Sequence, residues 1–148
     1  MMKQIRAFIS AAVLLALVGC ASLHTYVPEA NETTTSVQFL GFGKPKLWRD
    51  DDHRTLDLDV KENNGKRTML VPANKRITIW VPQTYYDHRV VSHCDAALSF
   101  VPVPGQEVVI FSGIHGRQCT IEAVRIDNSK LTGVAIDSSV AGPVNFQR

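Results

Sequence analysis

The chain has 148 residues, of which 45% are hydrophobic and 20% are charged, and its formal net charge is +2. This length suits one domain with a modest core and excludes two domains of ordinary size. The near balance of charges, without a run of Lys and Arg, gives no electrostatic footprint for nucleic acid, so a nucleic-acid partner is not expected.

The first residues have the organisation of a cleaved targeting segment. Lys3 and Arg6 precede an apolar stretch from Ala7 to Val18. A membrane-spanning helix needs about 20 apolar residues, so this stretch is too short to remain as an anchor. The sequence therefore predicts a signal peptide over residues 1–19.

The apolar stretch ends in Leu17-Val18-Gly19-Cys20, which resembles the lipobox of bacterial lipoproteins. The resemblance implies that Cys20 is acylated, typically with palmitate, and becomes the first residue of the mature chain. The membrane is then a partner through this cysteine. Because Ala21 and Ser22 follow it, where an aspartate would imply retention in the inner membrane, the resemblance implies attachment to the outer membrane, facing the periplasm.

Residues 20–35 are polar and show little periodicity. They predict a flexible tether that spans about 50 Å when taut. Residues 36–148 are then the single folded domain. Without residues 1–19 the chain keeps 14 basic and 14 acidic residues, so the mature protein is close to neutral.

Period-two alternation of apolar and polar residues dominates the domain, which predicts an all-β fold. The first strand contains Val37 and Phe39, and the clearest alternation runs from Leu56 to Val60. Asn64-Gly65 then predicts a tight hairpin, because the primed turns need positive φ angles. A strand from Ile77 is expected to end at Pro82, which cannot donate to a ladder.

The second half predicts longer strands. Val90 to Val101 forms one strand, a loop is expected over Ser112 to Arg117, and Gln118 to Ile126 follows with a bulge at Val124, where the phase slips. Seven or eight short strands favour an antiparallel β-sandwich, immunoglobulin-like or transthyretin-like, with a small barrel as the alternative.

Two cysteines remain in the domain, Cys94 and Cys119. In an oxidising compartment they predict a disulfide. The alternative is a zinc site formed by these cysteines with His88, His93 and His115. Its spacing matches no strong zinc motif, and neighbours such as His93 and Cys94 on a strand point to opposite faces, which also argues against a catalytic dyad.

Two other groups of residues are candidates for binding. Asp50-Asp51-Asp52-His53 offers oxygen ligands for calcium, although a solvated acidic loop is the simpler interpretation because the glycine and glutamate of an EF-hand are missing. Trp48, Tyr85 and Tyr86 lie outside the clear strand faces, so they are either a partner surface or plugs at the end of the core.

We find no serine elbow, no phosphate-binding glycine loop and no paired carboxylates in a known catalytic frame. The sequence therefore favours a non-enzymatic protein without a cofactor, an accessory or interaction module of an envelope complex. The alternative is a periplasmic module that binds a small ligand, a metal or a hydrolase that it inhibits.

Overall fold

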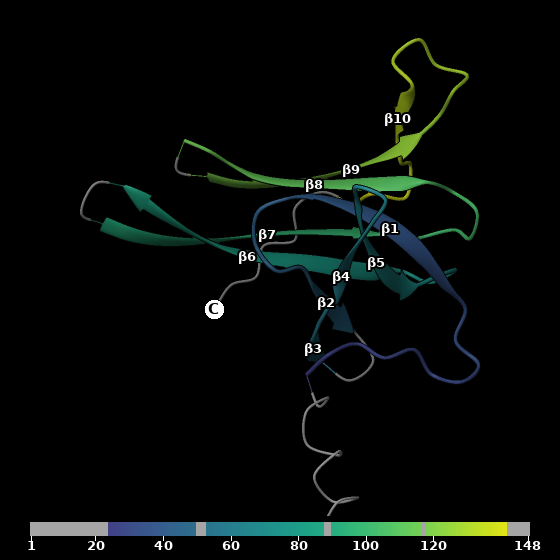
Figure 1. The fold of residues 1–148 in the computed structure, drawn as a ribbon, viewed down its shortest axis with the longest axis horizontal. Coiled ribbons are helices and arrows are strands. Elements are labelled where there is room, and N and C mark those ends of the chain that lie inside the picture. The colour runs from purple at the N-terminus through teal and green to yellow at the C-terminus, as the bar shows by residue number, and fades with distance from the viewer. Residues whose placement is uncertain (1–23, 50–52, 88–89, 117, 142–148) are drawn as a thin grey trace, which may run out of the picture.

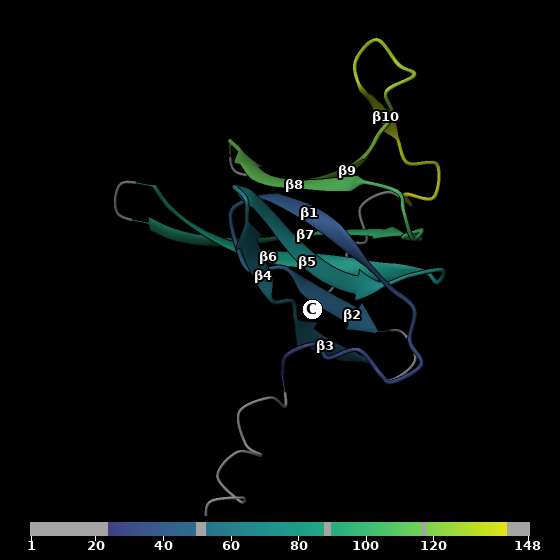
Figure 2. The ribbon, with the colours of Figure 1, turned by 45° about the vertical axis from the view of Figure 1, so that its right-hand side comes forward.

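The computed structural model of the protein describes residues 24–49, 53–87, 90–116 and 118–141. These residues form ten β-strands in two sheets that pack face to face (Figures 1 and 2). The predicted all-β sandwich is confirmed, with ten strands where seven or eight were expected. None of the described segments forms a helix long and apolar enough to cross a membrane.

The larger sheet has six strands in the order β10-β9-β8-β1-β5-β4. Its strands are β1 (Thr34–Gly41), β4 (Val60–Asn63), β5 (Lys66–Pro72), β8 (Val108–His115), β9 (Gln118–Ile126) and β10 (Val134–Ile136). β1 pairs antiparallel with β5 and parallel with β8. Because β1 and β8 are far apart in the chain, this central pairing joins the two halves of the sequence.

The smaller sheet has four strands in the order β3-β2-β6-β7. Its strands are β2 (Lys46–Arg49), β3 (Arg54–Asp57), β6 (Ile77–Asp87) and β7 (Val90–Phe100). β6 and β7 pair along their whole length, from Ile77 opposite Phe100 to Asp87 opposite Val90. They form the longest hairpin among the described residues.

The core lies between the sheets and contains every second residue of their strands. Fully buried side chains come from both layers, and the largest are Phe39, Leu47, Met69, Ile79, Phe100 and Ile110. Each such side chain contributes about 1.5 to 3 kcal/mol through the apolar surface it removes from water. The alternation in the sequence thus identified Val37 and Phe39 of β1 correctly as inward positions.

The alternating segment from Leu56 to Val60 is not one strand. β3 ends at Asp57 in the smaller sheet and β4 begins at Val60 in the larger sheet. Between them Leu58 is buried, and its N–H donates to the carbonyl of Pro45. The chain crosses from one layer to the other here, and the apolar positions keep their period because both halves face the same core.

Two strands are longer than the sequence predicted. β6 continues through Pro82 to Asp87, and β8 runs to His115 where a loop from Ser112 was expected. The register of β8 with β9 is unbroken, so there is no bulge at Val124. Val124 instead faces the outer side of the sheet, where it lies opposite Ile136 of β10.

Ser99 of β7 is only 6% exposed although it is a polar residue. The C-terminal part of the described chain covers it: Ala141 forms a bridge with Ser99, and its N–H donates to the Ser99 carbonyl at 2.9 Å. Arg76 joins the two segments, because its guanidinium donates to Ser99 Oγ and to the carbonyl of Ser139. Residues 142–148 lie outside the described residues.

The N-terminal segment also differs from the expectation of a flexible tether. Between residues 24 and 33, Tyr26 packs against the sandwich and is 6% exposed, whereas Val27 and residues 29–31 are exposed. Tyr26 donates from its backbone N–H to the carbonyl of Asp57, whose own N–H donates to the carbonyl of His24. An aromatic residue in a polar stretch gave too little pattern to predict this docking. Residues 20–23 lie outside the described part of the chain.

Candidate functional site

β6 has a long edge that its neighbouring strand does not cover. β2 pairs with β6 only from Thr78 to Trp80, whereas β6 continues to Asp87. Past Trp80, β7 is the one described strand that pairs with β6. This part of the hairpin projects beyond the rest of the sandwich in both ribbon views (Figures 1 and 2). We call residues 81–87 of β6 the open edge.

Pro82 shows which backbone groups face outward on this edge. Proline is tolerated inside a strand at a position where no neighbouring strand would accept a hydrogen bond from its backbone N–H, which proline lacks. A Cβ on Gly43 would lie 2.8 Å from the Pro82 carbonyl oxygen, so this carbonyl points away from β7 toward the loop that contains Gly43. Because these directions alternate along a strand, the backbone N–H and C=O of Thr84 and Tyr86 face the same open side.

A hollow of about 750 Å³ lies beside the open edge. Its lining combines apolar and polar side chains, among them Phe42, Pro82, Ile114, Lys44, Thr84 and His93. Phe42 is 75% exposed, although it is a large aromatic side chain. An apolar wall next to unpaired backbone groups is the arrangement in which an added strand is bound and one of its side chains is recognised.

Thr84 and His93 face each other across the hairpin, with 3.0 Å between Thr84 Oγ1 and His93 Nδ1. A hydroxyl and an imidazole at this distance also occur in nucleophilic catalysis. Here both side chains are exposed, so water competes for the bond and solvent is not kept away from the pair. The contact is best explained as a cross-strand pair that stabilises the hairpin.

Two buried polar side chains support the hollow from the inside. Ser112 Oγ donates to the carbonyl of Phe42 at 2.6 Å and so fixes the loop before β2. The side-chain amide of Gln83 donates to the carbonyl of Gly113 at 3.3 Å. These bonds connect the open edge to β8, so the wall of the hollow is formed by three separate parts of the chain.

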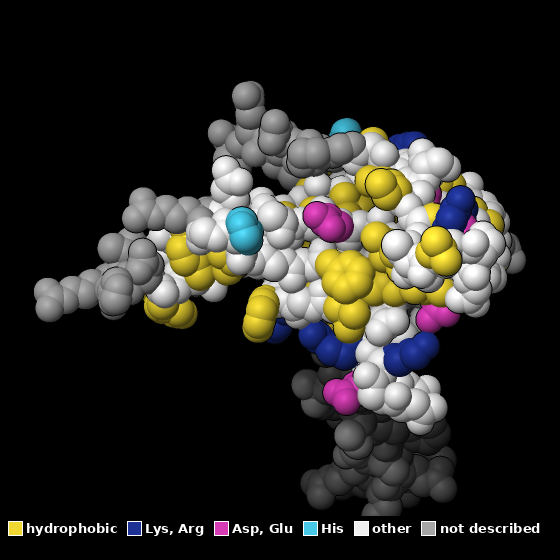
Figure 3. Space-filling model, turned by 90° about the horizontal axis from the view of Figure 1, so that it is seen from above, with side chains coloured by type: hydrophobic (Ala, Val, Ile, Leu, Met, Phe, Trp, Pro, Cys, Tyr) yellow, Lys and Arg dark blue, Asp and Glu magenta, His cyan; other side chains and the backbone are white. Residues whose placement is uncertain are grey.

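The outer face of the six-stranded sheet is a second exposed apolar surface. Leu40 of β1 lies opposite Phe111 of β8, and they are 36% and 43% exposed. Ile136 of β10 is 84% exposed. Figure 3 looks onto this face and shows hydrophobic side chains gathered near its middle. Such a surface can contact a partner, but the projecting strand edge and the hollow beside Phe42 define a binding mode more closely.

The three predicted aromatic residues do not form one surface. Trp48 lies on β2, not in a loop, and pairs with Thr78 of β6. Tyr86 follows Thr78 by eight residues on β6, roughly 26 Å away along the strand. Tyr85 is half-buried and Tyr86 is 80% exposed, both on the open edge. Only the tyrosines therefore belong to the candidate site.

Sequence reasoning missed Phe42 and the contact of Thr84 with His93. Gly41 and Gly43 flank Phe42 in the sequence, and both have positive φ angles. An aromatic residue between two such glycines was the available signal, because it cannot be buried within the turn itself. The pairing of Thr84 with His93 needed the hairpin register, which the expected strand end at Pro82 concealed.

The predicted disulfide between Cys94 and Cys119 is present, with 5.8 Å between their Cα atoms. It joins β7 to β9, and so connects the projecting hairpin to the other sheet. Both sulfurs are bonded to each other and are not thiolates for zinc. In the described part of the chain no three metal-binding side chains come together. Cys20, His88 and the three aspartates at 50–52 lie outside it.

No protein-family model matches this chain, and neither the curated proteins nor the solved structures compared with it include a match.

Proposed function

We propose that this protein is a non-enzymatic, lipid-anchored periplasmic protein of the outer membrane, which binds an extended segment of an envelope protein along the open edge of β6. The observation that carries the proposal is the length of β6 that continues past Trp80 with β7 as its one described strand partner. The proposed anchor is Cys20, at the end of the lipobox-like motif.

Strand addition suits this edge for two reasons. The outward N–H and C=O groups of Thr84 and Tyr86 can pair with a partner backbone whatever its sequence. The adjacent hollow can then take one apolar side chain against Phe42, which supplies selectivity. The edge has few of the devices that normally prevent pairing, apart from Pro82 and the loop that contains Gly43, both at its start.

The first test concerns the edge itself. Thr84→Pro removes an outward N–H without removing a bond to β7, and Thr84→Val is the matched control, because it keeps the N–H and loses the same hydroxyl. With a photo-crosslinking residue at Tyr86 in living cells, we expect one partner protein to be captured. Thr84→Pro should lower its yield at least tenfold, and Thr84→Val should leave it nearly unchanged.

A crosslinker at Leu131, which is fully exposed, serves as the positional control and should capture little of the same partner. Equal yields from Thr84→Pro and Thr84→Val would contradict strand addition. The anchor is tested separately: Cys20→Ala should move the protein from the membrane fraction to the soluble periplasm, and a variant that stays in the membrane fraction would contradict lipid anchoring.

The hollow also supports a second candidate, a module that binds a small ligand. Its volume falls within the usual range of about 300 to 1,000 Å³ for small-molecule sites. The two functions respond differently to substitution, because a ligand in the hollow depends on Phe42 and not on the backbone of Thr84. A compound that stabilises the protein, still binds Thr84→Pro and fails to bind Phe42→Ala would favour this candidate.

A further inference from the structure

The N-terminal segment, residues 24–33, is held to the sandwich at its first described residues. Asp57 N–H donates to the carbonyl of His24 at 2.6 Å, and Tyr26 N–H donates to the carbonyl of Asp57 at 2.8 Å. Thr25 thereby forms a parallel bridge with Asp57. These bonds cover the outer edge of β3 at Asp57, its last residue, where β3 forms the edge of the smaller sheet.

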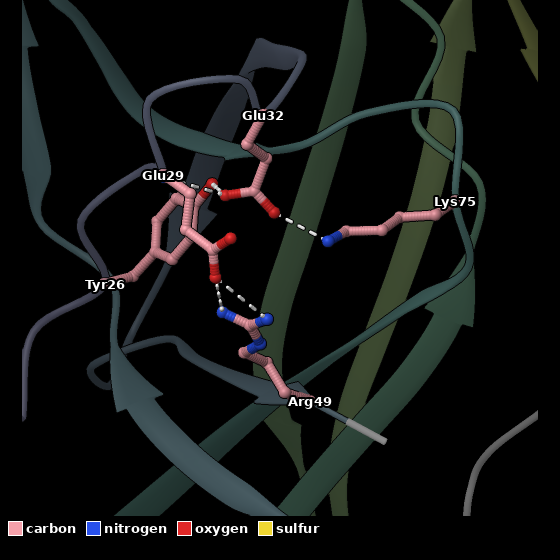
Figure 4. A network of polar contacts seen from close by, with 5 residues as sticks. All are labelled: Tyr26, Glu29, Glu32, Arg49 and Lys75. Carbon is pink, nitrogen blue, oxygen red and sulfur yellow. Dashed lines mark hydrogen bonds and ion pairs between the residues drawn. The ribbon is translucent and has the colours of Figure 1, made fainter. Parts of the chain in front are cut away.

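Charged side chains hold the rest of this segment (Figure 4). Tyr26 Oη donates to Glu32 at 2.7 Å, and Lys75 Nζ forms an ion pair with the other oxygen of Glu32 at 2.6 Å. Arg49 contacts Glu29 at 3.4 Å. The Glu32 side chain is only 8% exposed and the Lys75 side chain is 48% exposed, so the carboxylate is better covered than in an ordinary surface ion pair, although the ammonium group still meets water.

This docking shortens the reach of the proposed anchor. Only four peptide units separate Cys20 from His24, and they span at most about 14 Å when fully extended. A free tether that ended at the first strand would reach about 50 Å. We therefore propose that the docked segment holds the domain against the lipid surface, with the β3 side facing the membrane. This inference rests on the proposed acylation of Cys20.

The orientation determines which parts of the molecule face away from the lipid. In both ribbon views the described chain begins beside β3, and β10 lies at the opposite end (Figures 1 and 2). The projecting β6–β7 hairpin extends to the side of this direction. A partner on the open edge would then approach along the membrane, within a short distance of its surface.

The test measures how close two positions lie to the lipid. The full-length protein is purified in its lipidated form and placed in vesicles of phosphatidylethanolamine and phosphatidylglycerol that carry an acceptor dye on their headgroups. A donor is introduced at Lys61, which borders the same hollow as Thr25, or at Leu131 beyond β9. We expect energy transfer to be several-fold more efficient from Lys61 than from Leu131.

Two variants separate docking from anchoring. Tyr26→Ala with Glu32→Ala releases the segment, and a ten-residue Gly-Ser insertion after Cys20 lengthens the anchor while the segment stays docked. Both should reduce the difference between the two positions, whereas Val27→Ala should preserve it, because Val27 is 64% exposed in the same segment. The insertion gives the answer even if the double variant does not fold.

The outcomes distinguish this inference from the proposed function. A protein that does not float with the vesicles is not lipid-anchored, which overturns both. A protein that floats but shows equal transfer from Lys61 and Leu131 keeps its anchor and overturns only the orientation. If the original protein and the insertion variant showed the same difference in energy transfer between Lys61 and Leu131, the proposed orientation would also be overturned.

Discussion

At the scale of single residues, the contacts of Glu32 connect the N-terminal segment to the sandwich. Burial acts to raise the pKa of Glu32, but the hydrogen bonds donated by Lys75 and Tyr26 outweigh it, so the pKa lies below its ordinary value. Burial and the bond to Glu32 raise the pKa of Tyr26 above its ordinary range, so the phenol remains protonated. The pair therefore works as a neutral donor and a charged acceptor over the physiological range.

Glu32 should make stability depend on pH in acid. Because its pKa is lower in the folded protein, its contribution is complete above the unfolded value of about 4.3 and is lost as the pH falls through the folded value. We expect Glu32→Gln to cost about 1 to 2 kcal/mol at pH 7 and much less at pH 3. Urea denaturation at both pH values measures this.

Glu107→Gln is the matched control, because Glu107 pairs with Lys66 at 3.1 Å with both side chains more than half exposed. Its cost should be well below 1 kcal/mol at either pH, as for other surface pairs. If both variants cost the same at pH 7, the shielded network would have no special role in holding the N-terminal segment.

Gly41 ends β1 beside the backbone of β8. A Cβ at this position would lie 2.0 Å from the carbonyl oxygen of Ser112, and its φ angle is +140°. Gly41→Ala should therefore cost about 2 to 4 kcal/mol, because the backbone at the centre of the sheet must shift. Gly105→Ala, also at positive φ but with open space around it, should cost only about 1 kcal/mol in the same thermal or urea unfolding experiment. Similar losses would show that the φ angle, not the close approach, limits Gly41.

At the scale of elements, the hairpins show where local sequence is sufficient. Asn64 and Gly65 have φ angles of 52° and 72°, and Asn63 pairs with Lys66, as the Asn-Gly dipeptide predicted. The β6–β7 hairpin was harder to predict, because Pro82 ends a strand only if its N–H is needed by a neighbour. The pairing of β2 with β6 ends at Trp80, before Pro82, and the extent of this pairing depends on the tertiary arrangement.

The disulfide acts on this hairpin as an element. Its cysteines are 25 residues apart in the chain, so closing this loop in the unfolded state should stabilise the protein by about 3 to 4 kcal/mol. We expect Cys94→Ala with Cys119→Ala to lose that amount in urea denaturation. In the double variant we also expect amide hydrogen exchange to accelerate more along the open edge than in the centre of β1. The reason is that the disulfide connects the overhanging part of β7 to β9.

The reduced original protein should match the double variant, and reductant should leave the double variant unchanged. A loss of stability spread evenly over all amides, without extra exchange at the open edge, would contradict the idea that the disulfide holds the projecting hairpin in place.

At the scale of the whole molecule, the two layers come together through pairings that are distant in sequence. The parallel contact of β1 with β8 joins Phe39 to Ile110, and the segment around Leu58 passes from one sheet to the other. Neither feature changes the alternation of apolar residues along the chain. For that reason the sequence predicted the class of fold and most of the buried face, but not the strand order or the division at Leu58.

The candidate site was predictable only in part for the same reason. Tyr85 and Tyr86 were selected as exposed aromatics, but Trp48 belongs to another end of the sheet and Phe42 was overlooked. An open edge arises where one strand is longer than the strand beside it. Here the two strands are β2 and β6, which are not consecutive in the chain. No local pattern in either strand reports how far the other one extends.

The sequence by itself determined the all-β class, the Asn-Gly hairpin, the pairing of Cys94 with Cys119 and the expectation of a lipid anchor at Cys20, because each depends on a local pattern or on composition. The tertiary structure decided the open edge and the docking of Tyr26. These depend on which segments meet, and burial of Tyr26 against the sandwich outweighs the polar composition of the residues around it.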